Sequence, residues 1–371
     1  MRSARVAALC SLCLLLSANI ARAEEESSAA PLEPSAALEK VEEYVQPGLK
    51  WYLHYRLSEG EEGFDHRFHV SRGYITFKLK VTDWFQPRAT LDAHQDDEGD
   101  WEVRLKYLYG KFIVPLETRL ITRPNVEVGL VHTPWLDYEE HINHYRMQGT
   151  MALERSHLFN SADLGITAGA LLGERLDADY RQRVSSHYPG RWGSVAVGLY
   201  NGGGYHAEEQ NPNKVFMSRL SLRPLGWFLP NLQLSYYLIL GKGNTADEPD
   251  WSLHNLFASF EHEYFVLTGQ YGVGAGSQKG TLVDAGGEAL SYQAYSVFAE
   301  GKLPWIHSSL IARYDRFAPE REEPASHRFL AGYAFHFYKH NTLLLDLDAI
   351  THDDQRLWAW QATATLQVAY P

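Results

Sequence analysis

The sequence is poor in cysteine and has no long apolar run after its first residues. Its only cysteines, Cys10 and Cys13, lie within residues 1–23. If that stretch is removed, a disulfide framework and a thiolate metal site are both excluded. No later stretch reaches the roughly 20 apolar residues of a membrane helix, which excludes a helical membrane protein. Basic charge is scarce as well, since the net charge of −12 argues against nucleic-acid binding as the main function.

The first residues have the pattern of a secretory signal. Two arginines precede an apolar run at 6–16, and a small-x-small site ends at Ala23. This pattern predicts a cleaved signal peptide over 1–23. Residues 24–47 are acidic and rich in Ala, Ser and Pro, which predicts a periplasmic leader or linker, with a short oligomerising helix at 37–45 as the alternative.

From Gly48 to the end at residue 371, apolar and polar residues alternate with a period of two. Alternation of this kind is the pattern of β-strands with one apolar face. It occurs in 75–81, 101–109, 232–240 and 343–349. In the second of these runs, for example, Trp101, Val103, Leu105, Tyr107 and Tyr109 fall on one face, and Glu102, Arg104 and Lys106 fall on the other.

Three features favour a membrane barrel over a soluble sandwich. The strands are about 9–14 residues long, aromatic residues sit at their ends, and short connections alternate with long ones. The spacing predicts an all-β transmembrane antiparallel barrel of about 16 strands over 48–371. Counts of 14 or 18 remain open, because residues 173–192 are long for a turn. A barrel of this size encloses a lumen wide enough for water.

The same alternation assigns charged side chains to the lumen, because each would cost roughly 2–4 kcal/mol in lipid. A wetted wall without selectivity would also account for them. Basic residues concentrate on the second to fourth strands and acids on later ones, so we hypothesise a transverse field across the lumen. The predicted wall residues are Lys78, Lys80, Arg88, Asp92, Glu102, Arg104, Lys106, Glu127, Arg219, Arg223, Arg313, Asp315, Asp346 and Asp348.

Residues 133–163 separate two predicted strands and are too long for an ordinary connection. They mix aromatic and apolar residues with charges, and such groups need a surface to pack against. Inside a barrel, the segment would narrow the lumen and select what passes. Four histidines in and beside it suggest a metal site, but their spacing is irregular, and hydrogen-bonded or solvated histidines are the expectation.

Four stretches carry a family resemblance: VEVGLVHTPW (126–135), YRMQGTM (145–151), SADLGI (161–166) and GLYNGGGY (198–205). With them the chain resembles the phosphate-selective porins (O and P type) of the bacterial outer membrane. The resemblance implies a third loop folded into the barrel as the constriction, contacts with outer-membrane lipid, and a homotrimer. Carried over, the constriction residues are Asp137, Glu139, Glu140, His144, Arg146, Glu154 and Arg155.

The loop departs from the family in its charges, with five acids, two arginines and no lysine. An acidic ring favours cations or weakly polar neutral solutes, which argues against phosphate. No motif of an enzyme occurs. The sequence therefore predicts a porin for passive diffusion of small hydrophilic solutes or ions, without cofactor or metal. The alternative is a structural or adhesive outer-membrane barrel with a blocked lumen.

Overall fold

The computed structural model of the chain describes residues 44–60, 63–96, 99–320, 324–355 and 357–370. The predicted signal peptide and residues 24–43 of the predicted leader lie outside the described residues. The first strand begins at Val45, so the last residues assigned to the leader belong to the sheet.

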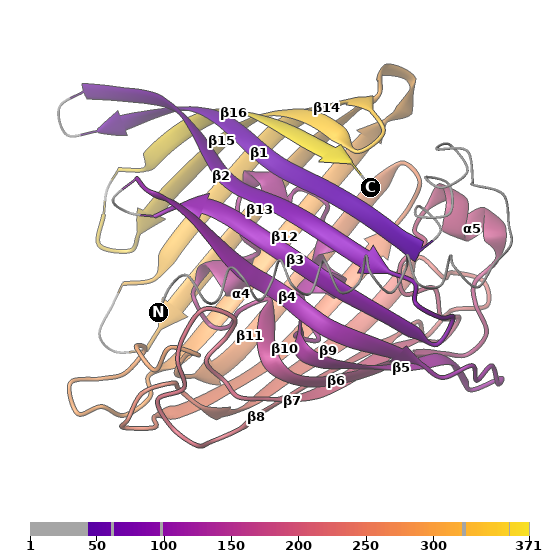
Figure 1. Cartoon of the computed structure of the whole chain (residues 1–371). Helices are drawn as coiled ribbons and strands as arrows, with labels where there is room; N and C mark the ends of the chain where they lie inside the picture. The colour runs from indigo at the N-terminus through magenta and orange to yellow at the C-terminus, as the bar shows by residue number, and fades with distance from the viewer. Residues whose placement is uncertain (1–43, 61–62, 97–98, 321–323, 356, 371) are drawn as a thin grey trace, which may run out of the picture. The chain divides into compact units, whose positions relative to one another are not determined.

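Across the described residues, sixteen antiparallel strands form one closed barrel, in which sequence neighbours pair and β1 pairs with β16 (Figure 1). The predicted fold and strand count are confirmed. The strands are β1 (Val45–Gly60), β2 (Gly63–Leu79), β3 (Phe85–Gln95), β4 (Trp101–Ile113), β5 (Ile121–His132), β6 (Ala162–Leu172), β7 (Gly193–Tyr200), β8 (Val215–Leu222), β9 (Leu232–Lys242), β10 (Asp250–Glu261), β11 (Phe265–Ala275), β12 (Ser291–Leu303), β13 (Ser308–Pro319), β14 (Ser326–Tyr338), β15 (Asn341–His352) and β16 (Ala359–Tyr370).

Among the described residues, the named helical segments lie in connections between strands. They are α3 (Leu136–Glu140), η1 (Arg146–Gln148), α4 (Ala152–Arg155), α5 (Ala178–Arg183) and η2 (Pro304–Ile306). Within the part of the chain that the structure describes, no helix is both long and apolar enough to cross a membrane.

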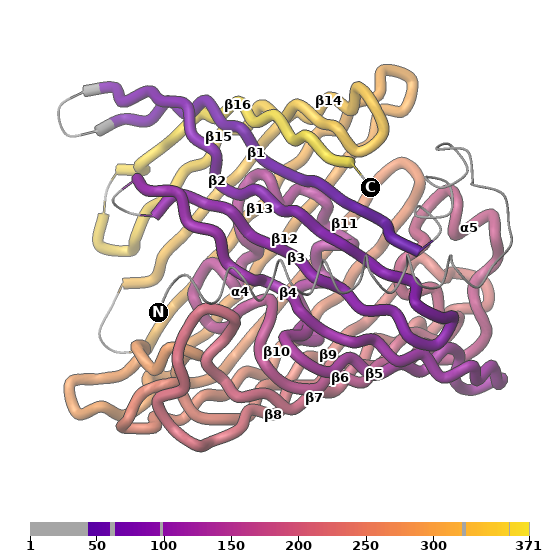
Figure 2. Tube along the Cα trace, viewed as in Figure 1, coloured from indigo at the N-terminus to yellow at the C-terminus, as the bar shows by residue number. Residues whose placement is uncertain are grey.

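The two ends of the barrel differ in their connections. One end, called the short-turn end below, carries the start of β1, the end of β16 and brief links such as 80–84 and 339–340. Figure 2 shows the C-terminus at the same end as α5, with β1 and β16 side by side. Residues 173–192, which left the strand count open, contain α5 and one isolated bridge at this end, but no strand.

The two faces of the sheet differ as the alternation predicts. In β9, Gln233, Ser235 and Tyr237 are buried, whereas Leu234 and Tyr236 are exposed. The same pattern recurs in β8, β10, β12 and β15. Burying polar groups while exposing leucine reverses the usual arrangement of a protein in water. The polar face lines the interior of the closed sheet, and the apolar face is its outer surface.

A bulge shifts this alternation in β4. The register against β3 slips between Thr90 and Leu91, and Lys106 has no partner across the ladder. One extra residue moves the following side chains to the other face. Tyr107 and Tyr109 are therefore buried inside, with Leu108 exposed between them. The prediction that these two tyrosines share the outer face of the strand is wrong.

Candidate functional site

Residues 133–161, called loop 3 here, connect β5 to β6 and hold several fully buried side chains. Trp135, Met151 and Leu153 are essentially inaccessible. Trp135 stacks on Tyr237 of β9, with 5.2 Å between ring centroids, and meets Phe257 of β10 edge-on at 5.3 Å. Because both partners belong to the inner face of the wall, the apolar half of loop 3 packs against the interior of β9 and β10.

Polar bonds tie loop 3 to the wall at widely separated strands. Pro134 accepts a 2.9 Å hydrogen bond from Nε of Arg219 on β8. The Tyr138 hydroxyl lies 2.9 Å from the Ser235 hydroxyl on β9. Tyr145 donates to Glu300 on β12 at 2.6 Å, and Arg155 pairs with Asp315 on β13 at 2.6 Å. Contacts that range from β8 to β13 fix the segment along one side of the interior.

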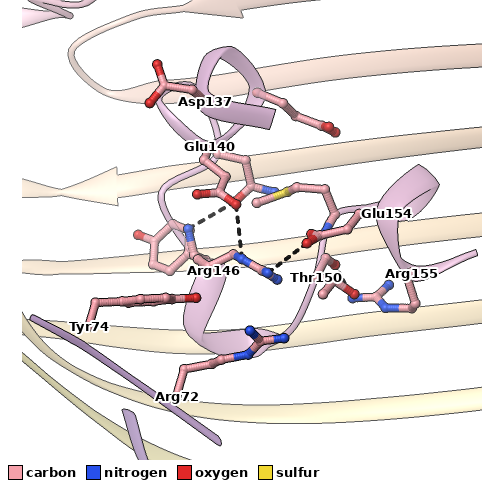
Figure 3. Close-up of polar contacts among 12 residues, drawn as sticks. Arg72, Tyr74, Asp137, Glu140, Arg146, Thr150, Glu154 and Arg155 are labelled. Atoms are coloured by element: carbon pink, nitrogen blue, oxygen red, sulfur yellow. Dashed lines mark hydrogen bonds and ion pairs between the residues drawn. The ribbon is translucent and has the colours of Figure 1, made fainter. Parts of the chain in front are cut away.

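The acids of loop 3 are engaged within the protein. Arg146 lies between two carboxylates, with its Nε 3.0 Å from Glu140 and Nη2 2.9 Å from Glu154 (Figure 3). Glu139 is buried and accepts a 2.7 Å bond from the Trp135 indole. Burial raises the pKa of Glu139 to about 7, even though Arg313 opposes the rise.

Asp137 also has partners on several sides. Tyr188 donates a 2.5 Å hydrogen bond to it, and a ring nitrogen of His141 lies 3.5 Å away. Burial acts to raise the pKa of Asp137, but His141, His132 and Tyr188 favour the charged form and hold it well below its usual range. Since these carboxylates are paired or hydrogen-bonded, the acid count of loop 3 is a poor guide to the charge that a solute meets.

Two cavities adjoin loop 3. The smaller, about 240 Å³, lies between η1 with its flanking residues and the wall strands β1, β2, β14, β15 and β16. Arg146 lines it from the loop, opposite Arg72 and Arg328 of the wall. Arg72 pairs with Asp92 at 2.5 Å, and Arg328 pairs with Asp348. The other charged side chains of its lining are Arg56 and Asp346, and the imidazoles of His54 and His69 lie beside them.

The larger cavity, about 640 Å³, lies between loop 3 and the short-turn end. It is bounded by inner faces of β2 to β8 and by residues 173–192, called the end segment here. Five of the predicted wall residues line it: Lys78, Lys80, Arg88, Glu127 and Arg219. Glu127 lies between Lys111 and His132, each at 3.0 Å.

The seven predicted constriction residues therefore occupy different surroundings. Arg146 lines the smaller cavity and Asp137 lines the larger one. Glu140 and Glu154 act through Arg146, and Arg155 joins the wall at Asp315. Glu139 is buried away from both cavities, and the His144 side chain is exposed. In the described residues, no three His, Cys, Asp or Glu side chains are placed to hold a metal ion.

The other predicted wall residues are mostly in ion pairs on the inner face. Arg104 pairs with Glu102 at 2.5 Å, and Arg313 pairs with Asp315 at 2.8 Å. Lys106 lies 4.6 Å from the centre of the Tyr74 ring. Arg223 donates to the backbone carbonyls of Tyr188 and Gly190 in the end segment.

Sequence reasoning missed several residues that line the cavities. Arg72 and Tyr74 share the parity of Lys78 on β2, so extending the alternation backwards would have found them. Arg175 and Arg181 lie in the end segment, where no periodicity indicates direction. Only the three-dimensional path of the chain brings that segment to the lumen.

Comparison with known proteins supports the architecture through structure alone. No family model matches the sequence, and no curated protein matches it. Among solved structures, the chain is similar to an anion-selective porin from Comamonas acidovorans, with a TM-score of 0.60 and 10% identity over 88% of this chain and 99% of that one.

Two further structures are similar. OmpT, an outer membrane protein of Vibrio cholerae in its trimer form, has a TM-score of 0.56 at 11% identity over 88% of this chain and all of that one. OmpF of Salmonella typhi, in complex with daunomycin, has a TM-score of 0.56 at 10% identity over 88% and 97%. At these identities the likeness concerns the fold, and the chain has the sixteen-stranded barrel fold of bacterial outer-membrane porins.

Proposed function

We propose that this protein is an outer-membrane porin that lets small hydrophilic solutes and ions diffuse passively through a water-filled barrel narrowed by loop 3. The observation that carries the proposal is the division of the sheet into a charged inner face with cavities and a leucine-rich outer face. Charges facing lipid would be costly, and leucines facing water would leave a large apolar surface exposed.

The outer surface supports a place in a membrane. Exposed aromatic side chains collect at the short-turn end, as in the interface girdles of membrane barrels. They include Trp84, Trp227, Phe228, Tyr264, Trp305 and Tyr338. Export through the predicted signal peptide, contact with outer-membrane lipid and assembly as a homotrimer belong to the same proposal, as does transport without catalysis. The more specific resemblance to phosphate-selective (O and P type) porins rests on four short sequence stretches.

The constriction that we propose is the passage between Arg146 of loop 3 and the wall at Arg72 and Arg328. Each of these arginines is paired with a carboxylate, so the proposed constriction carries charge of both signs. Glu140 and Glu154 hold Arg146 in place, while Arg155 and Tyr145 fasten the loop to β13 and β12.

Single-channel recording in planar bilayers tests the proposal. The purified mature chain should insert from detergent and produce discrete, ohmic current steps in potassium chloride. A structural or adhesive barrel with a blocked lumen is the second candidate, favoured by the bond from Tyr188 to Asp137, which joins the end segment to loop 3. Insertion without current steps, with the barrel verified by circular dichroism, would select that candidate and refute the porin.

A further inference from the structure

The larger cavity is lined by parts of the chain that lie far apart in the sequence. Strands β2 to β5 supply one side, with Lys78, Arg88 and Lys111. The end segment supplies another, with Arg175 and Arg181. Lys78 and Arg88 are directly opposed in the ladder between β2 and β3, so two cationic groups project together from that wall.

Several contacts hold the end segment in place as a wall. The ring of His187 packs against that of His141 of loop 3 in a tilted arrangement, with 3.7 Å between ring centroids. Tyr188 donates its 2.5 Å bond to Asp137, and Arg183 pairs with Glu263 at 2.5 Å across the short-turn end. Arg219 lies over the Tyr188 ring at 4.8 Å. The segment is therefore fastened to loop 3, to β8 and to the link between β10 and β11.

The charge of the cavity is strongly unbalanced. Its lining has two acids, Glu127 and Asp137, and both are already engaged inside the protein. Its cations are Lys78, Lys80, Arg88, Lys111, Arg123, Arg175, Arg181 and Arg219. In the described part of the chain, only Lys80 and Lys111 of these have a carboxylate within ion-pair distance. Nε of Arg175 is buried without a hydrogen-bond partner. Like charges that line one cavity repel one another, and an incoming anion would relieve that repulsion.

The remaining lining sets the kind of anion. The cavity is also lined by apolar and aromatic side chains, which include Leu79, Tyr109, Ile113, Leu171 and Val195. The volume of about 640 Å³ lies within the range of sites for drug-sized organic ligands, roughly 300–1,000 Å³. A bare inorganic oxyanion would fill little of this space and would leave the apolar wall wet.

We propose that this cavity is a binding site for organic anions that carry two or more carboxylates on an apolar body. Arginine and lysine from the β2–β3 wall bind one carboxylate, and Arg175 and Arg181 bind another from the end segment. The apolar body rests on the side chains between them. The inference rests on the proposed function in one respect, since a solute reaches the cavity through the lumen.

Binding and channel block by benzene-1,3,5-tricarboxylate test the proposal. Equilibrium dialysis with the detergent-purified mature chain should show saturable binding. In bilayers, the same compound should reduce the single-channel current saturably. The double variant Lys78→Gln/Arg88→Gln and the double variant Arg175→Gln/Arg181→Gln should each weaken binding by about tenfold or more, a factor that corresponds to about 1.4 kcal/mol.

A matched control is available at the same end of the barrel. Lys302 and Lys339 line neither cavity, so Lys302→Gln/Lys339→Gln removes the same charge without touching the site. Its affinity should stay within twofold of the parent. The neutral isostere benzene-1,3,5-trimethanol should not bind, and inorganic phosphate should bind at least about tenfold more weakly than the tricarboxylate, for lack of apolar contact.

The outcomes separate the two proposals. Binding that both cavity variants weaken, in a protein that conducts no current, would support the site and refute the porin. Current without saturable binding or block would keep the porin and overturn the site. Binding that neither cavity variant changes, or phosphate binding as tight as that of the tricarboxylate, would also overturn the site.

Discussion

Arg146 offers the sharpest test of the electrostatics at the proposed constriction. Its guanidinium lies between Glu140 and Glu154 and faces the smaller cavity. Arg146→Met keeps most of the side-chain volume but removes the only cation of this triad. The local charge changes by one unit, and two carboxylates lose their shared partner. We expect the channel to become more cation-selective.

The size of the effect follows from Coulomb's law. A univalent ion about 5 Å from one uncompensated charge interacts with it by roughly 0.8 kcal/mol, even at the dielectric constant of bulk water. That energy changes the local ion concentration about fourfold, upward for cations and downward for anions. The lower dielectric constant near the protein increases the effect, so the permeability ratio should change at least severalfold.

Reversal potentials in a tenfold potassium chloride gradient measure this ratio directly. At about 0.1 M salt the screening length is about 10 Å, so the missing charge should act fully on a passing ion. We expect a shift of at least about 10 mV toward the cation limit of about 59 mV. Above about 1 M salt the screening length falls to about 3 Å and the shift should shrink.

Two variants make the result specific. Arg146→Lys keeps the charge and should leave the reversal potential close to that of the parent. Lys339→Met removes a cation in the link between β14 and β15 at the short-turn end and should also leave it unchanged, because Lys339 lines neither cavity. A reversal potential that is the same for Arg146→Met and the parent at low salt would refute the placement of Arg146 at the constriction.

Three further predictions concern loop 3 and its fastening. Tyr188→Phe removes the bond to Asp137, worth about 1.5–3 kcal/mol for a charged acceptor, and should speed hydrogen exchange in residues 173–192. Tyr180→Phe removes a longer, 3.4 Å contact to the uncharged carbonyl of Pro230 and should not. Glu139→Gln should flatten the pH dependence of stability. Burial raises the pKa of Glu139 to about 7, so the native protein keeps a proton that the unfolded chain loses near pH 4.5. The unfolding free energy of the parent should therefore fall by roughly 3 kcal/mol as the pH rises from 4.5 to 7. The unfolding free energy can be measured by urea unfolding in micelles at several pH values. An equal dependence on pH for the parent and the variant would contradict the prediction. Trp135→Ala should cost about 3–5 kcal/mol in the same assay, because Trp135 is fully buried between Tyr237 and Phe257; a loss below 1 kcal/mol would contradict the packing.

The barrel could be predicted from the sequence because the alternation within each strand shows which of its side chains face the interior. In β9, the alternation of Gln233, Ser235 and Tyr237 with leucines fixes which face is buried, and the period of two applies to every residue of the strand. The pattern misleads where a bulge adds one residue, as at Lys106, because composition does not mark the slip. Tyr107 and Tyr109 are apolar enough for either face, so nothing in the sequence corrected the assignment.

The site could be predicted only in part. Loop 3 was recognisable by its length and its aromatic residues, but the pairing of its charges was not. Glu140 and Glu154 contact Arg146 across several residues of irregular backbone, for which the sequence has no periodicity to follow. The contact between the end segment and loop 3 could not be predicted from the sequence either. Tyr188 meets Asp137 because the end segment and loop 3 enter the interior from opposite ends of the barrel.

The seam of the barrel has a consequence for its biogenesis. β1 pairs with β16 from Leu49 opposite Tyr370 to Ser58 opposite Gln361, so the ring is completed by the first and last strands of the sheet. Such a ladder has the greatest separation along the chain and is slow to form. Until the final dozen residues are in place, both terminal strands present unpaired edges that invite aggregation. A chain that lacks its last strand cannot close the ring, so a nonsense mutation in β16 should yield no stable product instead of a smaller barrel.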